Sequence, residues 1–154
     1  MTSTMTDKDK GAVARLAAIM ELKRRVVEVG VLGDRAAAEA AGESGKTVAD
    51  IATYNEFGLG VPKRSFIRGY VDENRQPIGD LMVRMCKAVA AGKLSAANGF
   101  TALGLKLAAN IQERISRGIA PANAPETIKR KGSSKPLINT GQLRSSIVPR
   151  VVAR

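Results

Sequence analysis

Strand-forming sequence occurs in only two places in this chain, one near each end. Residues 26–32 read VVEVGVL, a β-branched run with partial alternation, and residues 143–152 read LRSSIVPRVV. β-Branched residues favour extended backbone because their side chains pack well on a pleated surface. Most of the sequence between the two runs has helical composition or spacing. This arrangement predicts an α+β fold, in which a small antiparallel sheet packs against several long helices.

Two strands are few for a sheet, since an isolated pair is only marginally stable in water. We therefore expect one of two outcomes. Either one or two further strands exist, with residues 33–44 the first place to look, or neighbouring subunits supply them. Pro149 predicts that the last strand lies at an edge or carries a bulge, because proline has no N–H group to donate to a sheet.

Helices are expected before and between the strands. Residues 11–20 favour a helix by composition, and a helix over about 48–57 can be capped by Ser44 or Thr47. Ser65 is expected to cap a helix that starts at Phe66, and Pro77 to break or kink it.

Two apolar stripes mark the remaining helices. The first stripe consists of Ile78, Leu81, Met82, Met85 and Val89. The second belongs to a helix that Ser95 caps and Gly118 ends, and it consists of Phe100, Leu103, Leu107, Ile111 and Ile115.

The length of 154 residues suits one domain with one core. Residues 1–10 are polar and are expected to form a flexible N-terminus, and residues 11–154 a single α+β domain. Within it, residues 119–142 are rich in proline and glycine. They are expected to form a long irregular loop, or arm, before the C-terminal strand. A loop of this length without its own core is usually functional or mobile.

Residue types that carry catalysis or bind metals are scarce. The chain has no histidine and a single cysteine, Cys86, for which a buried inert thiol is the expected role. We therefore expect no catalytic residues, no cofactor and no metal site. No segment has the length and composition of a membrane span or of a signal peptide, so synthesis in the cytoplasm and no membrane partner are expected.

The stretch AGESGKT (41–47) ends like a phosphate-binding P-loop. In that motif the first glycine should stand at position 40, which is Ala40, and a buried strand should precede it. The preceding RAAAEAA has helical or loop composition instead. The stretch is better explained as a turn followed by the N-terminus of a helix.

Positive charge is concentrated in the last third of the chain. The net charge is +11, and residues 112–154 contain nine basic and two acidic residues. A basic region of this kind predicts an acidic partner, either nucleic acid or an acidic protein surface. For the cluster at residues 129–135, such a partner and a plain solvated surface are both open interpretations.

Two segments resemble a known group of proteins. They are ATYNEFGLGVPKRSFIRGYVDEN (52–74) and APETIKRKGSSKPLINTGQLRSSI (124–147). A helix ending in Tyr-Asn-Glu-Phe-Gly, a Pro-x-Arg-x-Phe turn and a late Thr-Gly-x-Leu-Arg-x-Ser-Ile element resemble small virion proteins of tailed bacteriophages. These are the tail-component, neck and tail-completion proteins that act where head and tail join.

The resemblance implies a non-enzymatic structural protein that forms a homo-oligomeric ring. Its implied partners are other neck, connector and tail proteins, with packaged DNA passing through the lumen. Its implied location is the virion neck or tail, after assembly in the bacterial cytoplasm. Two alternatives remain: a tail terminator that caps the tail tube, and a basic nucleic-acid-binding protein. Few aromatic residues, at 3%, count against the second.

Ten residues are candidates for the interface with neighbouring proteins. They are Arg64, Phe66, Lys129, Arg130, Lys131, Lys135, Thr140, Gly141, Leu143 and Arg144. Residues 139–141 can form a side-chain-supported turn that launches the last strand. Phe57, Phe66, Leu143 and Ile147 are expected mainly to hold the domain together. For Arg64, Arg144 and residues 129–135, a role between subunits or beside DNA is favoured.

Overall fold

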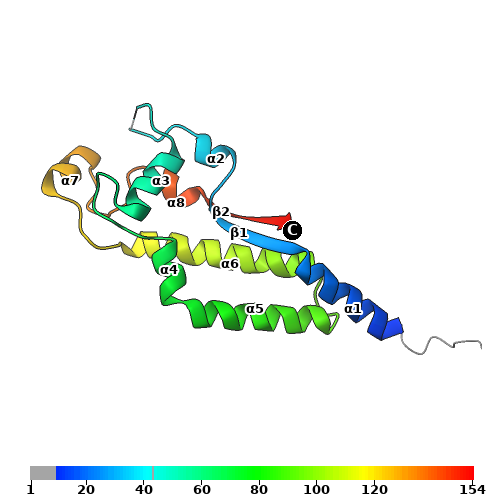
Figure 1. Ribbon diagram of the computed structural model, residues 1–154. Helices are drawn as coiled ribbons and strands as arrows, with labels where there is room; N and C mark the ends of the chain where they lie inside the picture. The colour runs from blue at the N-terminus through cyan, green and yellow to red at the C-terminus, as the bar shows by residue number, and fades with distance from the viewer. Residues whose placement is uncertain (1–9, 43) are drawn as a thin grey trace, which may run out of the picture.

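The computed structural model describes residues 10–42 and 44–154 and confirms the α+β prediction. Within this part the chain forms eight helices and one two-stranded antiparallel sheet (Figure 1). The strands are β1 (Arg25–Val31) and β2 (Ile147–Ala153), with Val27 opposite Val151 and Val29 opposite Pro149. The helices are α1 (Lys10–Lys23), α2 (Asp34–Ala37), α3 (Val48–Phe57), α4 (Arg68–Glu73), α5 (Arg75–Ala90), α6 (Ala96–Arg117), α7 (Pro125–Lys131) and α8 (Gln142–Ser145).

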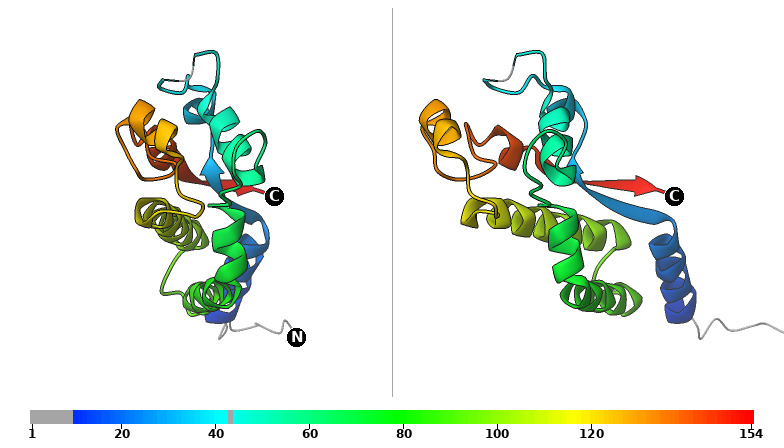
Figure 2. Two further views of the ribbon diagram at one scale, coloured as in Figure 1. Left: turned by 90° about the vertical axis from the view of Figure 1, so that its left-hand side faces the viewer. Right: turned by 60° about the vertical axis from the view of Figure 1, so that its left-hand side comes forward.

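Helix α6 is the centre of the molecule. It packs against both strands of the sheet, and α5 runs beside it (Figures 1 and 2). α1 and α7 lie at opposite ends of the molecule, while α2, α3 and α8 gather beyond the end of the sheet. The two strands close the first and last parts of the domain onto this central helix.

Two glycines let α6 approach its neighbours closely. A Cβ atom on Gly104 would lie 2.6 Å from Pro149 Cβ and 2.7 Å from Val27 Cγ2 in the sheet. A Cβ atom on Gly99 would lie 2.8 Å from Met85 Cγ on α5. Real Cβ atoms essentially never come this close to other atoms, so a larger residue at either crossing would require its neighbours to move.

The core consists of two clusters. The larger one joins α3, α4, α6 and α8 to the end of the sheet, and Phe66 and Ile147 are fully buried in it. The smaller one lies between α5 and α6 and contains Met85, Phe100 and Leu103. Of the stripe expected on α5, Met82 is 45% exposed and therefore lies outside the core.

Several end signals read from the sequence are confirmed. Thr47 caps α3 in a reciprocal arrangement with Asp50: its Oγ1 accepts from the Asp50 N–H at 3.2 Å, and Asp50 Oδ2 accepts from the Thr47 N–H at 2.9 Å. Ser95 caps α6, and Gly118 ends it. The chain breaks between α4 and α5 at Asn74, and Pro77 lies in the first turn of α5, where a missing N–H does no harm.

Three expectations need correction. The C-terminal strand does not begin at Leu143, because residues 142–145 form α8 and the strand starts at Ile147. The hydroxyls of Ser145 and Ser146 donate to the Gln142 carbonyl, which holds this turn in helical form. The expectation that residues 143–145 belong to the strand is therefore wrong.

Residues 119–142 are not irregular throughout, since they contain α7. Pro125 stands at its first position, Glu126 in its first turn, and Gly132, with φ of 67°, ends it. Proline at the first position and glycine after the last are ordinary helix-end signals, and here they mark the two ends of a short helix. Residues 33–42 contribute no third strand. They form α2 and one isolated bridge between Glu39 and Thr47.

The start of the expected flexible N-terminus, residues 1–9, lies outside the described residues, as does Glu43 of the P-loop-like stretch. Lys10 is already part of α1. No helix in the described part of the chain has both the length and the apolar character needed to cross a membrane.

Candidate assembly surface and basic pocket

Six of the ten candidate interface residues line one pocket. This basic pocket has a volume of about 410 Å³ and lies between Ala40, Ala41 and Lys46, α3, the linker at residues 61–64, α7 and residues 137–143. The six are Arg64, Arg130, Lys131, Thr140, Gly141 and Leu143. The fold thus brings together Arg64 and Leu143, which lie 79 positions apart in the sequence (143 minus 64).

The walls of the basic pocket combine positive charge with an apolar floor. Lys46 lines it together with Arg64, Arg130 and Lys131, and none of the described lining residues is acidic. Val48, Leu137 and Leu143 also line it, and each is at least nine-tenths buried. This composition suits a ligand that carries both a negative charge and an apolar group.

Arg64 is the most deeply buried of these cations, with 7% of its surface exposed. Its Nε donates to the Pro121 carbonyl at 2.8 Å, and its Nη2 donates to the Ala122 carbonyl at 3.2 Å and to Asn123 Oδ1 at 3.4 Å. Burial lowers the pKa of the guanidinium from its ordinary value. Arg64 therefore fastens the linker after α3 to the segment before α7.

The turn before α8 is tied to the loop after α2. Gln142 Oε1 accepts from the Ala41 N–H at 2.8 Å, and Gln142 Nε2 donates to the Glu39 carbonyl at 2.9 Å. Thr140 Oγ1 accepts from the Gln142 N–H at 3.4 Å, and Gly141 has φ of 84°. The side-chain-supported turn is confirmed, and it holds one wall of the basic pocket against another. The sequence alone does not identify Gln142, because its role depends on contacts with Glu39 and Ala41, which lie far from it in the sequence.

Leu137 lines the basic pocket in a conformation that L-residues rarely adopt. Its φ is 63°, although the residue is 8% exposed and belongs to the core. A bulky residue in the left-handed region costs on the order of 1–2 kcal/mol. Burial of the side chain and the contacts of the 137–143 turn must offset this strain.

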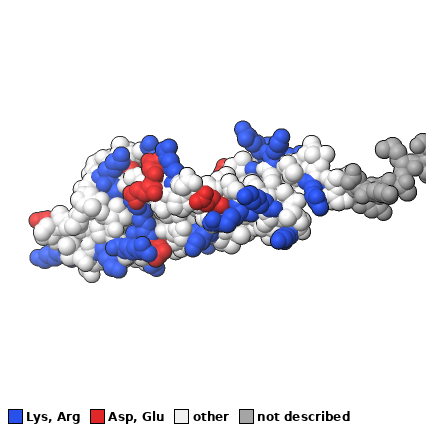
Figure 3. Space-filling view, turned by 90° about the horizontal axis from the view of Figure 1, so that it is seen from below, with Lys and Arg blue, Asp and Glu red and all other residues white. Residues whose placement is uncertain are grey.

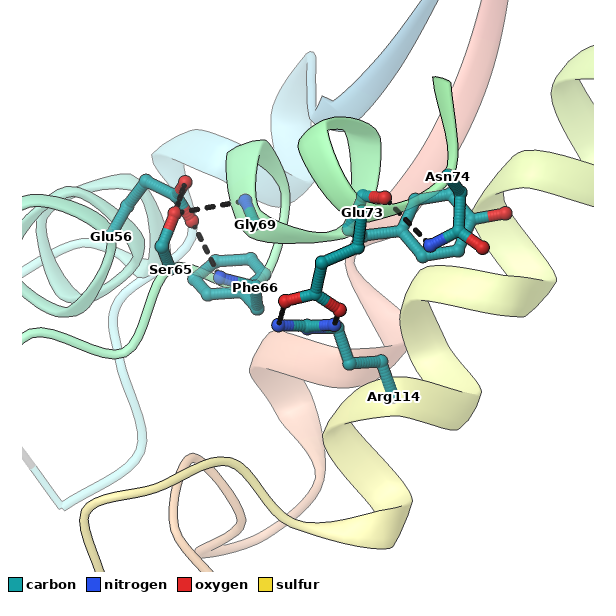
Figure 4. Close-up of polar contacts among 8 residues, drawn as sticks. Glu56, Ser65, Phe66, Gly69, Glu73, Asn74 and Arg114 are labelled. Carbon is teal, nitrogen blue, oxygen red and sulfur yellow. Dashed lines mark hydrogen bonds and ion pairs between the residues drawn. The ribbon is translucent and has the colours of Figure 1, made fainter. Parts of the chain in front are cut away.

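A buried carboxylate joins two parts of the segment at residues 52–74, the end of α3 and the turn before α4. Glu56, 6% exposed, accepts from Ser65 Oγ at 2.6 Å and from the N–H groups of Phe66, Ile67 and Arg68 at 2.8 to 3.0 Å (Figure 4). It therefore caps α4 from a neighbouring helix. Ser65 does not begin that helix; its Oγ accepts from the Gly69 N–H at 3.0 Å. The spacing of residues in the sequence does not predict this role for Glu56.

The apolar residues near these motifs fall into a buried group and an exposed one. Phe66 and Ile147 are fully buried and Leu143 is 7% exposed, which confirms that they hold the domain together. In the described chain, Phe66 is thus unavailable as a surface, and Leu143 is accessible only at the floor of the basic pocket. Phe57 is 50% exposed, so its expected anchoring role is wrong. Its ring lies 5.7 Å from the Arg68 guanidinium instead.

The remaining candidates lie outside the basic pocket. Lys135 Nζ donates to the Ser116 carbonyl at 3.1 Å, and Arg144 Nη1 donates to Ser116 Oγ at 3.0 Å. Both cations therefore sit at the C-terminal end of α6, where the helix dipole favours positive charge. Lys129 is exposed on α7 and is not part of the pocket wall.

A second surface, not foreseen, lies on α1. Val13, Leu16, Ile19 and Met20 are between 41% and 67% exposed. Their spacing places them on one side of the helix, away from Ala18 and Leu22, which face the rest of the molecule. We call these four residues the α1 stripe. The spacing was visible in the sequence, but only the structure shows that no other described element covers it.

The sheet next to α1 also has uncovered edges. Within the described residues β1 pairs only with β2, so each strand keeps one edge without a partner strand. On the face away from α6, Arg150 Nη2 binds Glu28 Oε2 at 2.6 Å, and Val26 beside them is 36% exposed. Open edges of this kind can pair with another chain.

Basic side chains are spread widely over the molecule. Figure 3 shows Lys and Arg along the length of the face seen from below, with acidic groups concentrated near its middle. Arg114 and Glu73 form a two-point ion pair in which Arg114 Nη2 lies 2.8 Å from Glu73 Oε1 (Figure 4). Acidic groups stand among the basic ones in Figure 3, so the basic side chains do not form one continuous patch on this face.

The P-loop-like stretch behaves as a turn before α3. The Ala40 N–H donates to the Lys46 carbonyl at 2.7 Å, which closes the loop, and Thr47 then caps the helix. Cys86 is half-buried. The described residues contain no group of three or more His, Cys, Asp or Glu side chains placed to hold a metal ion.

Comparison with known protein families, curated proteins and solved structures found no match.

Proposed function

We propose that this chain is a non-enzymatic structural protein of a tailed-phage virion, acting at the head–tail interface. In this role it is a neck or tail-completion subunit that forms a ring and joins the tail to the DNA-filled head. The phage assignment rests on the resemblance of residues 52–74 and 124–147 to such proteins. The self-association rests on the surfaces described above.

The α1 stripe is the observation that carries the proposal. Four large apolar side chains on one helical face, each at least 41% exposed, are unusual for a surface that stays in water. A second copy of the chain is the partner that every cell making this protein contains. A ring requires that each copy present two different surfaces, one to each neighbour. The stripe at one end of the molecule supplies the first surface, and the open edges of the sheet supply a candidate for the second.

A basic nucleic-acid-binding protein remains the second candidate, because the net charge is +11 and basic side chains extend along the face in Figure 3. Such a protein should bind duplex DNA as a small oligomer, with affinity that falls steeply as salt rises. The virion protein should instead form a closed ring by itself or on contact with tails or filled heads.

Sedimentation and electron microscopy of the purified protein test the self-association. We expect a ring, and we expect Leu16→Glu to dissociate it, because the substitution places a charge in the α1 stripe. Ala14→Glu is the matched control: it adds the same charge to an exposed position of the same helix, outside the stripe. A wild-type protein that stays monomeric in the presence of tails and heads contradicts the proposal.

Phage particles assembled without the protein test its place in the virion. Heads and tails that accumulate unjoined support the neck or tail-completion role. Tails of abnormal length support the tail terminator instead. Normal infectious particles that lack the protein contradict both roles.

A further inference from the structure

The charge of Arg64 is not balanced by the residues that hold it. Its three hydrogen-bond acceptors are two backbone carbonyls and the amide oxygen of Asn123, all neutral. Its Nη1 makes no hydrogen bond with any described residue. Neutral acceptors satisfy the donors that they contact but leave the net charge in place. An arginine that is 7% exposed usually has an anionic partner, because burying an uncompensated charge is costly.

The surroundings of Arg64 point to the chemistry of the missing partner. Arg64 lines the basic pocket, and none of the described lining residues carries a carboxylate. The same pocket has an apolar floor at Val48, Leu137 and Leu143. A volume of about 410 Å³ holds a few side chains.

We propose that the basic pocket binds an acidic segment of a partner protein, with a carboxylate at Arg64 and an adjoining apolar side chain on the floor. The identification of the partner as another virion component rests on the proposed function. The chemistry of the pocket is independent of that function. Guanidinium and carboxylate groups form short, charge-assisted hydrogen bonds, and these are stronger where water is excluded.

Protein fits the basic pocket better than DNA does. A duplex about 20 Å across meets proteins over broad surfaces of on the order of 1,000 Å² or more, and a pocket of this size cannot admit it. Single-stranded nucleic acid binds by stacking bases on aromatic rings. Tyr54 is the one aromatic residue among the described lining residues, and the Lys46 ammonium already lies 5.7 Å from its ring centre. An apolar floor gives a sugar–phosphate chain nothing to bind.

The smallest probe of this chemistry is N-acetylleucine, which carries one carboxylate and one apolar side chain. N-acetylleucinamide is its neutral match, and a short DNA duplex is the competing ligand. We expect N-acetylleucine to shift the methyl NMR signals of Ile51, Leu137 and Leu143 in a saturable way. The amide should bind at least roughly tenfold more weakly, because it cannot pair with the buried guanidinium. The duplex should leave these methyl signals unchanged.

Substitutions place the binding at this pocket. Thr127 lines the pocket on α7, and Thr127→Glu introduces an internal carboxylate that competes with the ligand. It should weaken N-acetylleucine binding roughly tenfold. Ile128→Glu is the matched control, since Ile128 is 36% exposed on the same helix and is not part of the pocket wall. It should change binding by less than about twofold.

Arg64→Lys tests the guanidinium itself. Lysine keeps the charge but has no planar fork, so it should weaken binding as well. Because this variant also loosens the 121–123 contacts, Thr127→Glu provides the result that does not depend on folding. The proposal is overturned if N-acetylleucine produces no saturable shifts, if the amide binds equally well, or if DNA moves the same methyl signals. Sedimentation of the wild-type protein and of Thr127→Glu separates the two proposals. If both form rings and only Thr127→Glu loses N-acetylleucine binding, both proposals are supported. If the wild-type protein is monomeric but binds N-acetylleucine, and Thr127→Glu does not, only the pocket is supported.

Discussion

Glu56 shows how much one side chain can do at the scale of a residue. Its two oxygens accept four hydrogen bonds from Ser65 and from the backbone of residues 66–68. Removing the carboxylate leaves three buried or half-buried N–H groups without a partner at the start of α4. The motif residues around it therefore have a structural role, because they join α3 to α4.

Glu56→Ala is expected to reduce the free energy of unfolding by about 3 kcal/mol, since each orphaned donor costs roughly 1–3 kcal/mol and water recovers part of the loss. Glu56→Gln keeps one acceptor and should cost less. Glu113→Ala is the control: it removes an exposed carboxylate paired with Arg117 and should cost under about 0.5 kcal/mol. Urea unfolding measures all three. Equal losses for Glu56→Ala and Glu113→Ala would contradict the capping role.

Glu73 gives a pH dependence at the same scale. The hydrogen bond from Arg114 lowers the pKa of its carboxyl below the ordinary value of 4.5. A group whose pKa is lower in the folded state stabilises that state above its unfolded pKa, and this stabilisation disappears as pH falls through the folded pKa. Between neutral pH and pH 3, wild-type protein should lose more stability than Glu73→Gln. Carbon-13 NMR titration should place the Glu73 midpoint below 4.5; a midpoint at or above it refutes the assignment.

At the scale of elements, the packing of α6 on the sheet depends on Gly104. Alanine at an ordinary helix position is more favourable than glycine by about 1 kcal/mol. At Gly104, however, the added Cβ would lie 2.6 Å from Pro149 Cβ, and α6 or β2 must move. Overpacking of this kind typically costs about 1–3 kcal/mol, so the net effect should be a loss.

Gly79→Ala is the matched control for Gly104→Ala, and we expect it to have the opposite effect on stability. Gly79 lies within α5, and a Cβ atom there would meet nothing within 4 Å. Thermal unfolding should show a lower melting temperature for Gly104→Ala and an unchanged or higher one for Gly79→Ala. A stabilised Gly104→Ala protein would mean that the helix and the sheet are not in such close contact.

Elements were predictable where a local signal decides them. Thr47, Ser95 and Gly118 mark helix ends by their own chemistry, and both strands announce themselves by β-branched residues. The start of the last strand was not predictable, because residues 142–145 turn into a helix under the control of Gly141 and of two serine hydroxyls. The basic pocket was predictable only as a set of residues. Its shape depends on Arg64 and Gln142, which reach across 57 and 101 positions or more of sequence.

At the scale of the whole molecule, the arrangement follows from which surfaces α6 covers and which surfaces it leaves exposed. α6 covers one face of a two-stranded sheet and one side of α5, while α1 extends from the sheet with only part of its surface against α5 and α6 (Figure 1). The α1 stripe is consequently the largest group of apolar side chains on one helix that no other described element covers. An isolated copy keeps this surface in water, and association removes it.

Association of this kind makes stability depend on protein concentration. A partner that binds only the folded chain raises the melting temperature by mass action, and for self-association the protein is its own ligand. The melting temperature of the wild-type protein should therefore rise as its concentration is increased.

Leu16→Glu should remove this dependence, because a charged side chain in the α1 stripe cannot be buried between copies without a partner. Ala14→Glu, on the same helix outside the stripe, should retain it. Differential scanning calorimetry over a wide concentration range separates these outcomes. A wild-type melting temperature that does not change with concentration would show that the α1 stripe is not covered by another copy, because burial in a neighbour cannot occur without this linkage.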